Sequence, residues 1–268
     1  MLMTNFLSSR KSIREYKKKS VNPELLEDIQ KYLNLLEKEA GNIEFRLYEN
    51  GSRIYNGLKG IGGYSGVMIE SPHYIGLNLK NKEDSTLIFG AYYMEKLITK
   101  LHSMGLGTCW ISIENVDRKL KEELFGDISG EINYLLAFGY PKPRNPFINE
   151  PFSHRIGVDE LVFNNKIGEP ISDKELENRG LDDLFYYVRF APSMLNKQPW
   201  RFILKEDKVI LLIKYKDGEV PNLIDAGIIM YYFEELSKTI GLSNKWTLIE
   251  GEEKVGDENY KYIGEFKL

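Results

Sequence analysis

The chain has 268 residues, of which 42% are apolar, 12% aromatic and 28% charged. This composition excludes a disordered chain and is typical of a globular protein with room for one large domain or two ordinary ones. The formal net charge is −4 and neither half is strongly basic, so we expect no nucleic-acid partner.

The first half is predicted to hold two long helices and three strands. Asn22 and Pro23 form a helix start, and Gly105 ends the second long helix. In chain order we expect a helix from residue 22 through 36, a strand at 43–48, a glycine-rich loop at 57–66, a strand at 73–79, a helix at about 83–104 and a buried strand at 134–138.

A proline-rich connection at residues 140–151 separates the halves and is predicted to lie on the surface. The elements expected beyond it are a helix at 182–189, a loop at 192–199, strands at 201–204 and 209–215, a helix at 223–240 and strands at 246–249 and 260–266. We therefore divide the chain into lobes at 1–145 and 146–268.

The second half repeats part of the first at an offset of 136 residues. Gly90–Glu114 falls on Ala226–Glu250 with six identities in 25 positions and no gap, and the same offset pairs residues 73–79 with 209–215. Any two helix-glycine-strand units resemble each other to some degree. Because one offset serves two separated segments, we favour an internal duplication.

Location and metal content follow from what the sequence lacks. The longest apolar runs are far below the roughly 20 residues of a membrane-spanning helix, so we expect no membrane association. The first residues lack the layout of a secretory signal, which predicts a cytoplasmic protein. A single cysteine and three histidines at no metal-ligand spacing argue against a disulfide and a structural metal.

Near the start, three cations and a hydroxyl occur within five residues: Arg10, Lys11, Ser12 and Arg14. We predict a helix here, which would place Arg10 and Arg14 on one face. Guanidinium groups bind phosphate in two-point fashion and a hydroxyl donates a further bond, so the cluster suits a phosphate. The alternative is a basic turn that only faces solvent.

The loop at 192–199 combines backbone rigidity with polar side chains. Pro192 fixes the backbone, while Ser193, Asn196 and Gln198 present donors and acceptors beside Trp200. Such a loop could bind the polar edge of a planar heterocycle. An ordinary polar loop next to a core tryptophan is the alternative.

Two further segments are candidates for binding. In Gly105-Leu106-Gly107 the glycines would let backbone N–H groups approach a ligand, although a helix stop alone explains Gly105. Arg155 follows the proline-rich connection and could supply a phosphate contact, as could Lys142 or Arg144. Each of these cations could equally be surface charge.

In this order and spacing, the four segments resemble the FMN-dependent nitroreductase family. The resemblance implies that Arg10, Lys11, Ser12, Arg14 and Arg155 bind the FMN phosphate. It also implies that the loop with Pro192, Ser193, Asn196 and Gln198 cradles the isoalloxazine edge, and that the backbone of Gly105, Leu106 and Gly107 passes near the reactive N5. Gly139-Tyr140-Pro141 matches the strand end that precedes the last basic residue in the family.

The order of the motifs departs from an ordinary family member. The Pro-Ser-x-x-Asn loop comes near residue 192 instead of after the first helices, where the offset places Lys59–Tyr64. Ordinary members are homodimers with FMN at the interface. The chain therefore resembles the branch in which one internally duplicated chain mimics the dimer, which implies an α+β fold of two interlocked lobes, each a mainly antiparallel sheet flanked by helices. One FMN between the halves and a monomer would then suffice.

The activity implied is a ping-pong cycle in which NAD(P)H donates electrons and a nitroaromatic, quinone or similar acceptor receives them. No catalytic protein side chain is implied, because the flavin supplies the chemistry. Two alternatives stay open: a non-catalytic FMN-binding protein for flavin storage or sensing, and a family member that has lost flavin binding.

Overall fold

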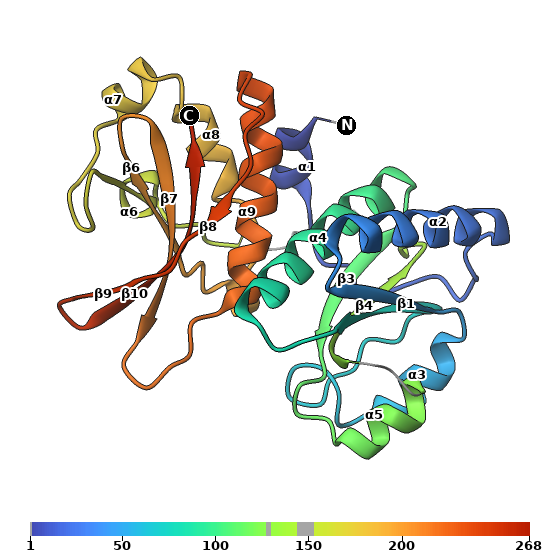
Figure 1. The fold of residues 1–268 in the computed structure, drawn as a ribbon. Helices are drawn as coiled ribbons and strands as arrows, with labels where there is room; N and C mark the ends of the chain where they lie inside the picture. Colours follow the sequence, from blue (N-terminus) through green and yellow to red (C-terminus); the bar gives the residue numbers. More distant parts are fainter. Residues whose placement is uncertain (1, 127–129, 144–152) are drawn as a thin grey trace. The chain divides into compact units, whose positions relative to one another are not determined.

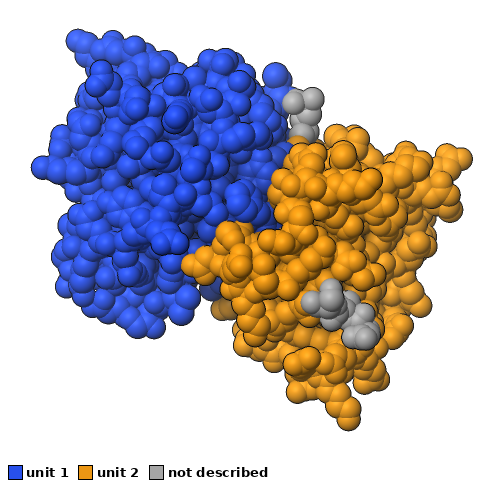
Figure 2. All heavy atoms as spheres, viewed as in Figure 1, with its two compact units in different colours: residues 1–10, 87–92, 151–268 blue, residues 11–86, 93–150 orange. Residues whose placement is uncertain are grey.

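The computed structural model describes residues 2–126, 130–143 and 153–268, drawn as a ribbon in Figure 1. The chain forms two compact units, coloured in Figure 2. The first-half unit comprises residues 11–86 and 93–150, and the second-half unit comprises residues 1–10, 87–92 and 151–268. Each unit is described by itself.

The first-half unit is built on a four-stranded sheet in the order β1-β2-β4-β3, and all of its neighbours are antiparallel. Every residue of the central strand β2 is buried. The strands are β1 (Ile43–Tyr48), β2 (His73–Leu79), β3 (Gly107–Ser112) and β4 (Glu131–Gly139). The helices are α2 (Pro23–Ala40), α3 (Gly51–Leu58), α5 (Arg118–Phe125) and α4 (Asp84–Ser103), of which residues 87–92 are counted in the second-half unit.

The predicted start of α2 is confirmed. The Asn22 side chain accepts a hydrogen bond from the backbone N–H of Glu24 at 3.3 Å, and Pro23 occupies the first helical turn. The buried residues Leu26, Ile29, Leu33 and Leu36 recur at helical spacing, so one stripe of α2 faces the core.

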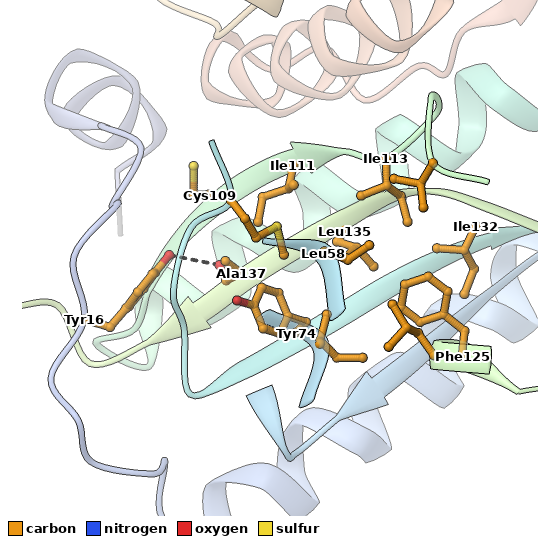
Figure 3. Close-up of a cluster of buried hydrophobic side chains, with 14 residues drawn as sticks. Tyr16, Leu58, Tyr74, Cys109, Ile111, Ile113, Phe125, Ile132, Leu135 and Ala137 are labelled. Atoms are coloured by element: carbon orange, nitrogen blue, oxygen red, sulfur yellow. Dashed lines mark hydrogen bonds between the residues drawn. The ribbon is translucent and has the colours of Figure 1, made fainter. Parts of the chain in front are cut away.

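One core cluster of this unit joins the sheet to α3 and α5, and Figure 3 shows its side chains converging. Leu58 comes from α3, Phe125 from α5 and Tyr74 from β2. Tyr16 closes one side of the cluster, where its hydroxyl donates to the carbonyl oxygens of Ile13 at 2.7 Å and Ala137 at 3.1 Å. Burial raises the pKa of that hydroxyl well above its usual range.

The second-half unit contains a sheet in the order β5-β6-β7-β10-β8, with β9 paired to β10. Only the β5–β6 pair is parallel. The strands are β5 (Val162–Asn164), β6 (Trp200–Leu204), β7 (Lys208–Lys216), β8 (Thr247–Leu248), β9 (Glu252–Val255) and β10 (Glu258–Lys267). The helices are α1 (Met3–Ser9), α6 (Val158–Leu161), α7 (Asp173–Asn178), α8 (Asp182–Val188) and α9 (Leu223–Ser237), with short 3₁₀ turns η1 (Met194–Asn196) and η2 (Lys238–Ile240).

Helix α9 is the centre of this unit, because all of its residues except Glu235 are buried. A helix that is apolar on every side is a core helix. The Phe233 ring on α9 lies 5.0 to 5.9 Å from four other aromatic rings, those of Phe185, Phe202, Trp246 and Phe266. Such tilted and edge-on contacts add to the energy of burial.

The two sheets share one strand order. Along β1-β2-β4-β3 and along β6-β7-β10-β8, every neighbouring pair is antiparallel, and a long helix precedes β3 as α9 precedes β8. A duplication predicts this common order. This common order also makes β1 the counterpart of β6, which differs from the alignment at a constant offset of 136 residues. The loop before β6 corresponds to the two-residue link between α2 and β1, Gly41 and Asn42, and not to residues 59–64.

The compact units differ from the division at residues 1–145 and 146–268. Helix α1 packs against α8 and α9, with the Phe6 and Tyr232 rings 6.2 Å apart, so the first ten residues belong to the second-half unit. The proline-rich connection falls largely on residues 144–152, outside the described part of the chain. The division into lobes at 1–145 and 146–268 stays a prediction.

Two local predictions are wrong. Residues 57–66 are not all loop, because α3 continues through Leu58. The basic cluster is not on a helix, because α1 ends at Ser9 and Arg10 has extended backbone angles. Of the described helices, none is long and apolar enough to cross a membrane.

Candidate functional site

The loop between α8 and β6 has an unusual backbone. Leu195, Asn196 and Gln198 all have left-handed conformations, with φ of 52°, 57° and 48°. A left-handed conformation costs a residue with a side chain roughly 1–2 kcal/mol, so surrounding contacts must hold this loop in place. Strain of this kind is found most often at binding and catalytic sites.

Backbone N–H groups of the loop are bound by side chains at both of its ends. The Met194 N–H donates to Oδ1 of Asp225 at 3.0 Å, and the Gln198 N–H donates to Oγ of Ser193 at 2.9 Å. Asp225 is buried in the first turn of α9, whose position is fixed by the core. The loop is therefore anchored to the most completely buried of the long helices, α9.

The Gln198 side chain joins the loop to residues 154–156. Its Oε1 accepts from the Ile156 N–H at 3.0 Å, and its Nε2 donates to the His154 carbonyl at 3.1 Å and to the Asn196 carbonyl at 3.2 Å. The side chain is 3% exposed. Both ends of its amide are thus bonded inside the protein, as buried polar groups require.

Asn196 and Arg155 are bonded to each other. An Arg155 Nη1–H donates to Oδ1 of Asn196, and the Asn196 amide donates to the His154 carbonyl at 2.9 Å. Arg155 also donates through Nη2 to the Phe190 carbonyl at 3.3 Å. The sequence predicted Arg155 and the loop for one site, and the structure brings them into direct contact.

Positive charge gathers at this place. Burial lowers the pKa of the Arg155 guanidinium, and the nearby charges of Arg10 and Arg189 lower it further. Arginine still keeps its proton in proteins, so the three residues place three like charges near one another. Among the described residues, no carboxylate forms an ion pair with Arg155 or Arg189. Guanidinium groups gathered in this way have the charge and the donors that suit an anion.

The rest of the predicted phosphate segment belongs to the first-half unit. Lys11, Ser12 and Arg14 are exposed, and the segment runs along the edge strand β3, where the Ile13 N–H donates to the Thr108 carbonyl at 2.8 Å. The tertiary bond to β3 explains why the segment is extended instead of helical.

The Gly105-Leu106-Gly107 turn has structural roles of its own. Gly105 has φ of 78° and its N–H donates to the His102 carbonyl at 2.9 Å, while the Leu106 N–H donates to the Leu101 carbonyl at 3.0 Å. These bonds close the C-terminus of α4. A Cβ on Gly107 would lie 2.7 Å from Cγ1 of Ile13, so the close approach of Ile13 already requires glycine there.

A polar pocket of about 600 Å³ lies in the first-half unit. Arg14, Lys17 and Lys142 contribute cations to its wall, and Glu15 pairs with Lys142 at 3.5 Å. Arg144, the other suggested phosphate contact, lies outside the described residues. Glu49 and Glu70 also line the pocket, so its wall carries charges of both signs and does not by itself mark an anion site.

The structure thus gathers part of the predicted set in the second-half unit: Arg10, Arg155, Pro192, Ser193, Asn196 and Gln198. The other part lies in the first-half unit: Lys11, Ser12, Arg14, Gly105, Leu106 and Gly107. Two residues of this arrangement, Arg189 and Asp225, are not among the predicted site residues. Arg189 stands three residues before Pro192 and was visible as a cation beside the motif, whereas Asp225 is recognisable only from the fold.

A family model described as "Putative TM nitroreductase" matches residues 3–237. The chain belongs to this family. A crystal structure described as a putative nitroreductase from Thermotoga maritima shares the fold, with a TM-score of 0.60 and 18% identity over 98% of this chain and 94% of that one.

Two further nitroreductase structures each cover about half of the chain. An FMN-dependent nitroreductase from Clostridium difficile has a TM-score of 0.44 and 26% identity, covering 54% of this chain and 91% of its own. A nitroreductase with bound FMN from Bacteroides fragilis has a TM-score of 0.46 and 14% identity, covering 56% of this chain and 94% of its own. No curated protein sequence matches the chain.

Proposed function

We propose that the chain is an FMN-dependent oxidoreductase that takes electrons from NADH or NADPH and reduces a nitroaromatic, quinone or similar acceptor. Membership of a nitroreductase family supports the general class. The observation that carries the proposal for this chain is the contact of Arg155 with the left-handed loop at Asn196, inside a cluster of arginines.

This cluster fits the phosphate of FMN. Within the described part of the chain, Arg155 and Arg189 each use two of their five N–H donors, so donors of both remain for a ligand. A phosphate dianion would also relieve the repulsion among Arg10, Arg155 and Arg189. Phosphate bound by guanidinium groups in this way forms strong, charge-assisted hydrogen bonds.

The residues proposed to hold FMN divide by role. Arg10 and Arg155 would bind the phosphate, and the loop from Pro192 to Asn196 would lie against the ring. Gln198 is buried and fully bonded, so we assign it the positioning of this loop. The contacts that the resemblance gives to Lys11, Ser12, Arg14 and the Gly105-Leu106-Gly107 backbone stay predictions.

When bound, FMN supplies the two-electron redox chemistry, and the protein residues orient the group and neutralise its charge. We assign no protein general acid or base. We further propose one FMN per chain. The first-half unit has only Gly41 and Asn42 between α2 and β1, where a second copy of the loop would stand.

The test is a spectrum followed by turnover. Purified protein mixed with FMN is expected to bind it, shown by a perturbed flavin absorption band, and then to oxidise NADH or NADPH when a nitroaromatic or quinone is present. Flavin binding without turnover would support a storage or sensing protein instead. Failure to bind FMN at all would refute the proposal and leave a family member that has lost its cofactor.

A further inference from the structure

Arg189, at the end of α8, is held by its neighbours in a fixed orientation. Its guanidinium carbon lies 4.4 Å from the centre of the Tyr186 ring and 5.0 Å from that of Phe190. Its Nε–H donates to the Tyr186 carbonyl at 3.1 Å. Stacking on aromatic rings stabilises a guanidinium group and fixes its plane, so the remaining N–H donors have fixed directions.

Arg189 and Arg155 make reciprocal contacts. Arg189 donates through Nη1 to the carbonyl oxygen of Ile156, the residue after Arg155, at 3.3 Å. Arg155 donates through Nη2 to the carbonyl oxygen of Phe190, the residue after Arg189, also at 3.3 Å. Two chain segments that are 33 residues apart are therefore joined with both guanidinium groups at the junction.

The two guanidinium groups at this junction carry like charges that act on each other. Two stacked or half-buried guanidinium groups repel each other, and no carboxylate of the described residues pairs with either one. If Arg155 and Arg189 only donated hydrogen bonds to these backbone carbonyls, a neutral side chain with an N–H donor would be enough. An anion bound by both groups accounts for the charge that the fold retains.

We infer that Arg189 is a further phosphate-binding residue, which with Arg155 makes the site select phosphorylated flavin over riboflavin. The inference rests on the proposed function for the identity of the ligand, but the anion site can be tested separately. Arg189 acts by direct charge-assisted bonds, so its loss weakens binding only of ligands that carry the phosphate.

The experiment compares Arg189→Gln, Arg189→Lys and a control. Arg53→Gln is the control, because Arg53 is the residue at the 136-residue offset and its Nη2 makes one exposed bond, to the Glu123 carbonyl at 2.8 Å. Kd values for FMN and riboflavin are measured by flavin fluorescence. Arg189→Gln is expected to raise the Kd for FMN about tenfold or more and to leave the Kd for riboflavin unchanged, because the lost charge-assisted bond is strong and only FMN carries the phosphate. Arg189→Lys should recover part of the affinity for FMN, and Arg53→Gln should change the Kd for neither ligand.

The inference would be overturned if Arg189→Gln weakened the binding of FMN and of riboflavin equally and Arg189→Lys bound FMN no better than Arg189→Gln. Arg189 would then be only a structural link between the two segments. Inorganic phosphate separates this result from failure of the proposed function. Phosphate should raise the melting temperature of the wild type and raise that of Arg189→Gln less, even if no flavin binds. An equal rise in both proteins would also overturn the inference.

Discussion

Replacing Gln198 by leucine tests whether this side chain holds the strained loop in place. Leucine is similar in size, so the substitution removes hydrogen bonds without opening a large cavity. The Ile156 N–H loses its acceptor and becomes a buried donor without a partner. The His154 carbonyl keeps its bond from Asn196, so it loses less.

The expected cost is about 2–4 kcal/mol in the free energy of unfolding. An unsatisfied buried donor contributes about 1–3 kcal/mol of this, and each other lost bond contributes about 1 kcal/mol. The measurement is urea denaturation followed by tryptophan fluorescence, since Trp200 begins β6 directly after the loop.

Gln30→Leu is the matched control for this substitution. Among the residues that the structure describes, the Gln30 side chain bonds only Asn34, at 2.9 Å on the exposed side of α2. Its loss should therefore change stability by less than about 0.5 kcal/mol. A change as small as this in Gln198→Leu would refute the assignment. We also expect Gln198→Leu to weaken FMN binding, because the left-handed residues would relax.

Two further predictions concern the first-half unit. Gly107→Ala should destabilise it by about 1–3 kcal/mol, because the new Cβ would lie 2.7 Å from Cγ1 of Ile13. Adding Ile13→Ala to the same chain should restore part of the melting temperature lost. An unchanged melting temperature for Gly107→Ala would contradict the close packing of Ile13 on this glycine. Burial lowers the pKa of His73, whose Nε2 accepts from the Val21 N–H at 3.0 Å, so the unfolded chain takes up a proton at higher pH than the folded one. Stability should therefore fall as pH drops below about 6.5, and His73→Gln should flatten that dependence between pH 7 and 5; equal slopes in both proteins would show that His73 is not the group responsible.

Elements marked by local chemistry were predictable from the sequence. The Asn22-Pro23 start of α2 and the alternating residues of β1 need no tertiary information, and the start of α2 and both ends of β1 agree with the structure. Helix α3 was missed because it contains Gly51 and Gly57, which lower helix propensity. A Cβ at Gly57 would lie 2.5 Å from Leu124 of α5, so the glycine is required by packing that only the fold reveals.

In the candidate site too, the sequence predicted residues one by one but not the contacts that the fold creates between them. The sequence singled out Arg155 and the loop with Asn196 separately, and their bond depends on how residues 154–156 pass beside the loop. The extended segment at Arg10 was interpreted as helical, because its charge spacing gives no sign of the bond from Ile13 to β3. Gln198 was assigned to the ligand because composition alone cannot distinguish a binding amide from a buried one.

The central claim is that one chain holds one FMN, since only one of the two sheets is preceded by the loop that contacts Arg155. The most direct measurement is the flavin released from a known amount of protein, taken together with the particle mass from light scattering. The account predicts one FMN for each 31.1 kDa chain, whether the protein is a monomer or associates further. Two flavins per chain, or one flavin shared by two chains, would contradict it.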